Sequence, residues 1–238
     1  MSGDAALAFV VQVGLASGLD SRDREAVARG LAEAGRALEG VVSSHASVHL
    51  DLSVGGLDLT WDLRARDEDA ARRVETRLAQ ADGLAEFAPD LASRVERLEV
   101  GRPCVLASGV RHPGLVGIKR TLWLRVEPLA PAEAVARFEQ ETPLLADAIP
   151  AIRNWRWSRL PARGSGPGAI RWTHLWEQEF EAVDGLQVDY MSSPAHWGYV
   201  DRWFDPEMPE RVVDLWLAHT ACPESEPVLS WGAAERVA

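Results

Sequence analysis

The 238-residue sequence predicts an α+β protein in which the element order β-α-β-β-α-β occurs twice. Three observations carry this prediction. Segments whose apolar residues alternate with period two come in adjacent pairs, as in β-hairpins. Segments with apolar residues three and four positions apart, as in amphipathic helices, precede and follow each pair. The same order is found on both sides of the stretch Gly109 to Leu115, which contains glycine and proline and is taken as the boundary.

The first half opens with AFVVQVGL, Ala8 to Leu15, which is typical of a strand because β-branched and apolar residues dominate it. Asp20 or Ser21 can cap the helix that follows. Two alternating runs on either side of Gly55-Gly56 predict a hairpin. The expected elements are a strand at 8–15, a helix at 20–38, hairpin strands at 48–54 and 57–63, a helix at 71–83 and a last strand at 95–106.

The second half repeats the order. Pro143 should break or kink its first helix, because proline lacks an N–H and disfavours helical backbone at Thr142. The glycine-rich run RGSGPG joins two strands and therefore is not a phosphate-binding loop, which would open a helix. The expected elements are a strand at 117–127, a helix from Pro131, hairpin strands at 152–160 and 170–180, a helix at 182–191, an aromatic connection at 189–206 and a strand at 210–220.

Each repeat is a ferredoxin-like unit. One four-stranded sheet covered by helices on one side leaves its other face bare, so we expect the two sheets to pack face to face as an intramolecular pseudo-dimeric α+β barrel. The expected domains are a scaffold half at 1–110, a pocket-bearing half at 111–222 and a tail at 223–238. Large side chains on both faces of Ile170 to Phe180 fit a sheet buried on two sides. The alternation of Glu177, Glu179 and Glu181 is interpreted as a solvated strand edge.

Composition excludes several classes. A hydrophobic content of 47% and a charged content of 26% are those of a globular protein. The net charge of −11 disfavours nucleic acid and anionic membranes as partners. No basic leader or membrane-length apolar run is present, which predicts a cytoplasmic location. Cys104 and Cys222 are too few for a disulfide framework and are expected to be reduced and to fill core space. His219-x-x-Cys222 is interpreted as a strand end, and no metal site is expected.

Tryptophan is distributed unevenly. Of ten tryptophans, nine follow residue 120, so the two halves serve different purposes. The run DYMSSPAHWGYVDRWFDP, from Asp189 to Pro206, gathers a histidine, two tyrosines and two tryptophans. These rings either fill a core or line a pocket.

The segment from Leu115 to Cys222 resembles the stress-responsive A/B barrel (Dabb) family of dimeric α+β barrels. Four runs carry the resemblance: IKRTLWLRV, AIPAIRNWRWS, THLWEQEF and DYMSSPAHWGYVDRWF. The first half follows the family only in topology. The family includes polyketide cyclases that close poly-β-ketones by aldol condensation without metal or organic cofactor, and the resemblance implies such a site here.

On this resemblance, His196 after Pro-Ala corresponds to the catalytic base, Tyr190 to the active-site tyrosine, and His174 to a histidine that opens the third strand. Two positions depart from the family, since Arg120 and Ser193 stand where it has histidines. Arg120 is a permanent cation that could bind a carboxylate or another anion of the ligand, or could be a salt-bridged surface residue. The other predicted substrate-binding residues are aromatic: Trp123, Trp172, Trp176, Trp197, Tyr199 and Trp203.

Other readings stay open. His196 could cap a helix or bond a backbone carbonyl, and His174 could belong to the core. The leading hypothesis is a cofactor-independent acid–base enzyme, cyclase-like and of the lyase or isomerase class, acting on a hydrophobic or aromatic, polyketide-like molecule. The alternatives are a non-catalytic binding or stress-associated protein, and a cofactor-free oxygenase or a haem protein with His174 or His196 as axial ligand. Leu59 occupies the place of His174 in the first half, so one site per chain is expected, in a monomer or weak homodimer.

Overall fold

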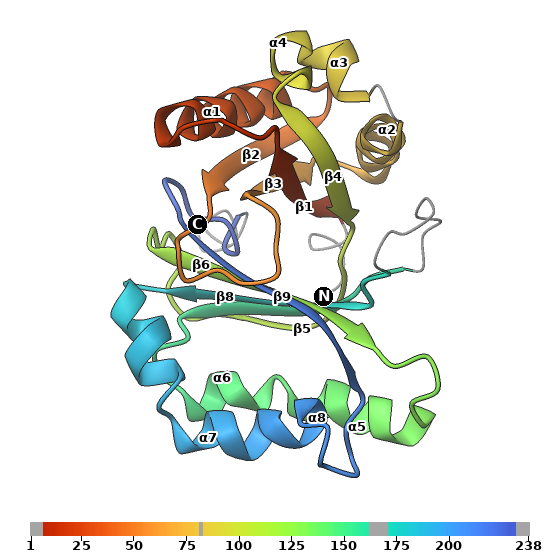
Figure 1. Cartoon of the computed structure of the whole chain (residues 1–238), viewed down its shortest axis with the longest axis vertical. Helices are drawn as coiled ribbons and strands as arrows, with labels where there is room; N and C mark the ends of the chain where they lie inside the picture. Colours follow the sequence, from red (N-terminus) through yellow and green to blue (C-terminus); the bar gives the residue numbers. More distant parts are fainter. Residues whose placement is uncertain (1–6, 81–82, 162–170, 232–238) are drawn as a thin grey trace.

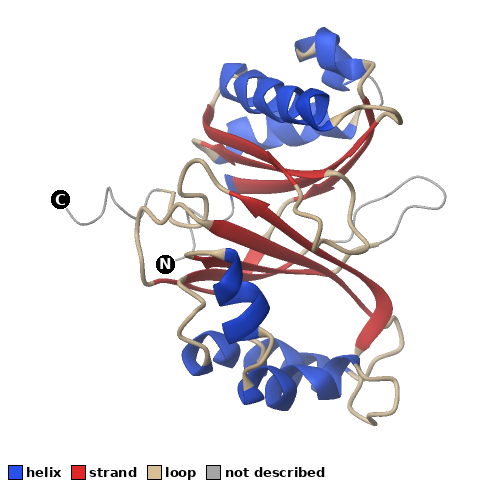
Figure 2. Ribbon diagram, turned by 60° about the vertical axis from the view of Figure 1, so that its left-hand side comes forward, coloured by secondary structure: helices blue, strands red, loops and turns tan. Residues whose placement is uncertain are grey.

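The computed structural model describes residues 7–80, 83–161 and 171–231. Its elements form four layers, with helices outside two antiparallel sheets that face each other (Figures 1 and 2). The predicted α+β class and tandem arrangement are therefore confirmed. None of the described helices combines the length and apolar composition that a bilayer crossing requires. The predicted RGSGPG turn lies outside the described residues.

The first-half sheet has the order β2-β3-β1-β4, with all its strand pairs antiparallel. Asp20 caps α1 by accepting a hydrogen bond from the Asp23 amide at 2.8 Å, and Asp67 caps α2 through the Ala70 amide at the same distance. The elements are β1 (Ala8–Leu15), α1 (Ser21–Ala37), β2 (Val41–Val48), β3 (Leu59–Ala65), α2 (Glu68–Ala79), α3 (Gly83–Phe87), α4 (Pro89–Ala92) and β4 (Val95–Gly101).

The predicted hairpin strands at 48–54 and 57–63 are wrong, because the paired strands are β2 and β3, and the residues around Gly55-Gly56 form a longer loop between them. Strand β2 ends at Val48, and residues 49–58 leave the sheet to contact the second half. There Val54 and His219 exchange two backbone hydrogen bonds of 2.7 and 2.8 Å, and the Leu50 amide donates to the Ala221 carbonyl at 2.8 Å. Gly55 has φ +74°, and a Cβ would lie 2.5 Å from a carbonyl oxygen of the second half. This loop covers part of an open sheet edge.

The second-half sheet has the order β5-β7-β8-β6-β9. Pro143 separates α5 from α6, as the sequence predicted. The aromatic run expected as a connection is instead a series of short helical turns, some of them π-helical. The elements are β5 (Cys104–Val110), β6 (Ile118–Val126), α5 (Ala132–Glu141), α6 (Leu144–Ala148), β7 (Asn154–Arg159), β8 (His174–Phe180), η2 (Gly185–Tyr190), α7 (Pro194–His196), η3 (Trp197–Asp201), α8 (Arg202–Phe204) and β9 (Val213–Pro223).

The strand expected at 95–106 is divided between the two sheets. Its first part is β4, which pairs with β1, and the chain then crosses so that β5 pairs with β7. The first half thus contributes an edge strand to the second sheet. Cys104, expected in the core, is exposed on this edge strand, whereas Cys222 is buried.

Apolar clusters fill the space between each sheet and its helices, while the layer between the sheets combines a small apolar cluster around Val10 and Trp123 with a group of buried charged residues. At its centre Lys119 is fully buried, contacts Asp62 of β3 and lies 3.1 Å from a Glu177 oxygen. Arg156 donates to both Glu177 oxygens at 2.6 and 2.8 Å. The interpretation of Glu177 and Glu179 as a solvated edge is therefore wrong, because both carboxylates are buried against the other sheet.

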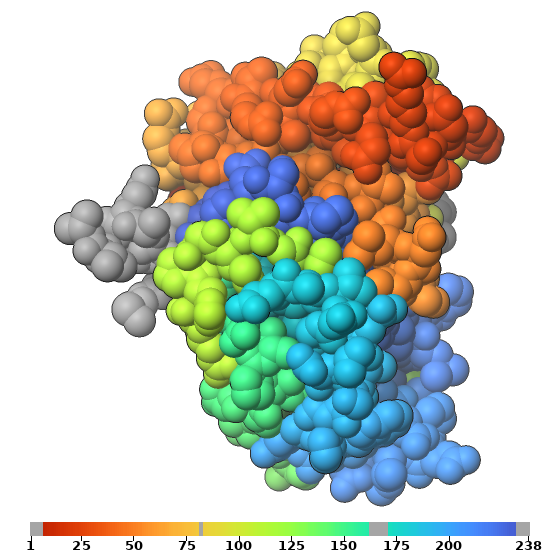
Figure 3. Space-filling model, turned by 90° about the vertical axis from the view of Figure 1, so that its left-hand side faces the viewer, coloured from red at the N-terminus to blue at the C-terminus, as the bar shows by residue number. Residues whose placement is uncertain are grey.

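The segment after β9 joins the two halves. Figure 3 shows it in blue between the first half above and the second half below. Ser225 lies 3.3 Å from the His45 ring of β2, while the Leu229 amide donates to Glu179 at 2.6 Å. Val228 is buried. The described part of the predicted tail is thus part of the interface.

Candidate functional site

A cavity of about 180 Å³ lies between the second-half sheet and its helices. It is on the outer side of the sheet, not between the two sheets. Strands β6, β8 and β9 form its floor, and α6, η2, α7, η3 and α8 cover it. Its lining is mainly apolar with a few polar groups, as in small-molecule sites. The lining residues are Arg120, Leu122, Leu124, Thr142, Leu145, Trp176, Tyr190, His196, Val200, Asp201, Trp203, Phe204 and His219.

Local backbone structure places Tyr190 and His196 beside each other. Tyr190 ends the π-helical turn η2, and His196 lies in the short turn α7 that begins at Pro194. Ser193, at a position where the resemblance expects histidine, caps this turn by accepting from the Ala195 amide at 3.3 Å. The Tyr190 and His196 ring centroids are 4.7 Å apart in an edge-on arrangement. Such π-helical turns often mark functional sites.

His196 is a half-buried imidazole with an available nitrogen. Its Nδ1 is buried and has no hydrogen-bond partner in the described chain, so the helix-capping reading has no support there. Burial, and secondarily the positive charge of Arg120, lower the pKa of His196 to about 4. The ring is therefore neutral at pH 7 and can accept a proton, although it is a weaker base than free imidazole.

Arg120 lies on the cavity floor, where its side chain is almost fully buried. Its Nη1 donates to Gln178 Oε1 at 2.5 Å, and its Nη2 donates to His219 Nδ1 at 3.1 Å. The guanidinium carbon also lies 5.1 Å from the centroid of the Tyr190 ring. Arg120 thus connects the strand floor to the tyrosine above it.

His219 is a cavity residue that the sequence reasoning missed. An arginine can only donate, so His219 Nδ1 accepts and the proton of the neutral ring is on Nε2. Burial, and then the charges of Arg120 and His196, lower the pKa of His219 to about 3. The available signal was strand register, because His219 lies opposite Leu122 in the β6–β9 pair and shares the helix-facing side of the sheet.

His174, the third predicted catalytic residue, is outside the cavity. Its ring is buried and stacked on Trp157 with centroids 5.1 Å apart. Both ring nitrogens are engaged, Nε2 with Glu139 at 3.0 Å and Nδ1 with Thr173 at 2.9 Å. The structure therefore corrects the expected catalytic grouping, because Phe138 lies between His174 and the cavity residue Trp203.

The predicted aromatic wall is divided. Trp176 and Trp203 line the cavity. Trp123 instead faces the first-half sheet, since β6 alternates between its two sides. Trp172 precedes β8, and its indole N–H donates to Glu99 of β4; both tryptophans pack near Val10. Trp197 is 56% exposed, and Tyr199 packs against the core without lining the cavity. Four of the six predicted aromatic contacts thus lie elsewhere.

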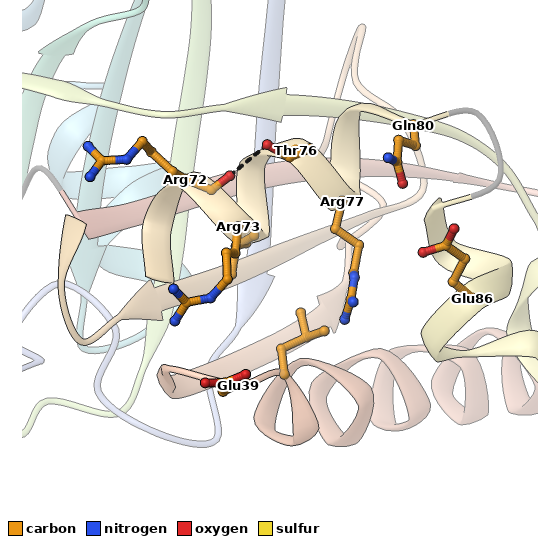
Figure 4. Close-up of a pocket in the computed structure, with 9 residues that line it drawn as sticks. Glu39, Arg72, Arg73, Thr76, Arg77, Gln80 and Glu86 are labelled. Atoms are coloured by element: carbon orange, nitrogen blue, oxygen red, sulfur yellow. Dashed lines mark hydrogen bonds between the residues drawn. The ribbon is translucent and has the colours of Figure 1, made fainter. Parts of the chain in front are cut away.

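A second hollow lies on the first half, between α2 and the end of α1, and is more open (Figure 4). Arg73 and Arg77 extend from α2 toward Glu39, and the Thr76 hydroxyl donates to the Arg72 carbonyl. Arg72 is paired with Glu68 and Asp69 on the helix surface. The residues that line this hollow include arginines and glutamates but no histidine or tyrosine, so it lacks the imidazole and phenol that the cavity combines.

The described residues do not group three or more histidine, cysteine, aspartate or glutamate side chains in a way that could hold a metal ion. In particular, His219 and Cys222 point to opposite faces of β9, because three positions separate them along a strand. They cannot act as a ligand pair.

Comparison with known proteins supports the fold. Residues 118–215 match the family model described as Stress responsive A/B Barrel Domain. No curated protein matches the sequence. A solved anthrone oxidase-like protein is similar over 93% of both chains, with TM-score 0.64 and 14% identity.

Two bacterial structures described as candidate monooxygenases are also similar. The one from Lactobacillus acidophilus has TM-score 0.52 and 10% identity, covering 93% of this chain and 98% of its own. The one from Fusobacterium nucleatum has TM-score 0.57 and 9% identity, covering 92% and 94%. Identities this low establish a shared fold only.

Proposed function

We propose that the second half, whose residues 118–215 match the model of the stress-responsive A/B barrel domain, binds a small aromatic or polyketide-like molecule and performs acid–base chemistry on it. One observation carries the proposal. The cavity brings an unpartnered imidazole, a phenol and a guanidinium together against an apolar wall.

His196 is the proposed base. It would remove a proton from a carbon next to a carbonyl group, the first step of an aldol-type ring closure. Tyr190, whose ring lies beside His196, would donate a hydrogen bond to the enolate oxygen that forms. The low pKa of His196 makes proton removal uphill, so stabilisation of the enolate by Tyr190 must supply part of the driving force.

Deuterium exchange tests this step without knowledge of the substrate. Acetophenone, a single-ring aryl ketone, should incorporate deuterium from D2O faster in the presence of the protein. The His196→Ala variant should lose the acceleration, because the base is gone, and Tyr190→Phe should weaken it. His112→Gln is the matched control, since His112 is exposed and remote from the cavity.

The remaining outcomes separate the alternatives. Acetophenone that quenches tryptophan fluorescence but exchanges no faster than in buffer would indicate a binding protein without catalysis. Equal acceleration by wild type and His196→Ala would show that another group is the base.

A cofactor-free oxygenase is the second candidate, because three similar solved structures are described as an anthrone oxidase-like protein and as candidate monooxygenases. It would share the first step, since a deprotonated phenolic substrate reacts with dioxygen more readily than the neutral one. Oxygen uptake with a phenolic substrate, lost in His196→Ala, would favour it over ring closure.

A further inference from the structure

Arg120 is a buried cation with no carboxylate within salt-bridge distance among the described residues. Its side chain is 3% exposed, and its contacts are with Gln178, His219 and the Tyr190 ring, all of them neutral. Lys119, its neighbour in β6 on the opposite face, has two carboxylates instead. A buried charge is costly unless an opposite charge accompanies it. The position of Arg120 therefore calls for an anion that the chain itself does not supply.

The first half shows that the fold does not require these polar residues. Arg120 pairs with Gln178, and its neighbour Leu122 pairs with His219. At the corresponding positions of the first-half sheet Phe9 pairs with Leu63, and Val11 pairs with Val100. Arginine, glutamine and histidine in one repeat thus stand where the other repeat has phenylalanine, leucine and valine.

We propose that Arg120 forms an oxyanion subsite on the floor of the cavity and that the ligand is a single-ring aromatic carboxylate. Gln178 and His219 are positioning residues, because they hold two nitrogens of the guanidinium. The inference rests on the proposed function in that it assumes ligand binding in this cavity. It adds the charge and the size of the ligand.

The size follows from the volume. A protein cavity of about 150 Å³ binds benzene. The cavity here, of about 180 Å³, therefore suits one aromatic ring with a small substituent. Trp176, Leu122 and Leu145 supply apolar surface for the ring, and Arg120 supplies the charged end.

A bound carboxylate would also change the base. The charge of Arg120 contributes to the low pKa values of His196 and His219. A carboxylate on Arg120 offsets that charge, so His196 becomes more basic when the site is occupied. Besides the two histidines, the titratable groups that line the cavity are Tyr190 of η2 and Asp201 of η3. Burial and then Asp205 raise the pKa of Asp201.

Benzoate and benzamide provide the test, since they match in shape and differ in charge. Titration calorimetry on the full chain should show benzoate binding about tenfold or more tightly than benzamide. Arg120→Gln should abolish this preference while benzamide affinity stays the same. Arg125→Gln, on the same strand but paired with Asp214 at 3.3 Å, is the matched control and should keep the preference.

A second measurement needs no variant. Proton NMR of the wild-type histidines should show the His196 pKa rising when benzoate binds and staying constant with benzamide. Equal affinity for both probes, a preference that survives in Arg120→Gln, or an unchanged His196 titration would overturn the subsite. Benzamide binding without a benzoate preference would leave the proposed function standing, whereas binding of neither probe would overturn both.

Discussion

Replacing Lys119 by methionine tests how the two sheets are held together. Lys119 of β6 is fully buried and contacts Asp62 of β3, so the pair joins the two halves. Burial opposes its charge, but the carboxylates of Asp62 and Glu177 outweigh that effect and raise the Lys119 pKa. Without the ammonium, Glu177 still has Arg156 at 2.6 Å, whereas Asp62 becomes a buried charge with one oxygen already unpartnered.

The expected cost of K119M is about 3–5 kcal/mol, the usual penalty for removing one member of a buried ion pair. At about 2–4 °C per kcal/mol for a chain of this size, Tm should fall by roughly 6–20 °C. Arg72→Met is the matched control. Arg72 is paired with Glu68 and Asp69 on the exposed face of α2, so its loss should cost about 0–1 kcal/mol.

A second substitution separates charge from packing. In K119M/D62L the stranded carboxylate is gone and the Arg156–Glu177 pair remains, so most of the lost stability should return. Thermal unfolding followed by circular dichroism measures all variants. A K119M cost no larger than that of Arg72→Met, or a double variant no more stable than K119M, would refute the account of the interface.

Three further outcomes follow. Glu224 is buried beside Glu179, and burial and then the Glu179 charge raise its pKa, so its ionisation destabilises the fold as pH rises above about 4.5. Glu224→Gln should therefore raise Tm more at pH 8 than at pH 5, whereas Glu25→Gln, at an exposed position of α1, should not. The acid limb of the exchange rate should lie near the His196 pKa of about 4, and a limb at 6.5 would contradict the assignment. Leu145→Trp should fill the cavity and block benzamide binding, whereas Leu144→Trp, at a 41% exposed position of the same helix, should not.

Most elements could be predicted from the sequence because period-two and helical patterns are local. The loop 49–58 could not, because its apolar alternation matches a strand and its hydrogen-bond partners are on β9. The prediction that Glu177 lies on a solvated edge was wrong for a related reason. Alternation shows that the two faces of β8 differ, but it does not show whether the Glu177 carboxylate is bound by water or by the Arg156 guanidinium.

In the candidate site too, the residues placed by local sequence could be predicted and those placed by distant contacts could not. His196 and Tyr190 are six positions apart, so a short segment brings them together and its sequence shows it. The orientation of the His174 ring depends on its hydrogen bond to Glu139, which lies 35 positions away in the sequence. His219 enters the cavity only through the register of β9 against β6, which no local pattern reveals.

The two halves use the space between sheet and helices differently. In the first half α1 is one 17-residue helix, and a Cβ at Gly35 would lie 2.1 Å from the Ser44 hydroxyl, so helix and sheet are in direct contact. The Trp61 indole bonds that same hydroxyl at 3.0 Å. In the second half, Pro143 divides the helix that corresponds to α1 into α5 and α6. π-Helical turns stand where the first half has α2, and the cavity lies beneath these shorter elements.

That cavity has a stability cost. At about 24 cal/mol per Å³, the value for a closed core cavity, a volume of about 180 Å³ sets an upper limit of roughly 4 kcal/mol on this cost, against the 5–15 kcal/mol that stabilises a typical protein. The first half is joined to the second through Lys119, residues 49–58 and the segment after β9, and we expect its packing to offset this cost. A ligand that fills the cavity should recover part of the lost packing energy.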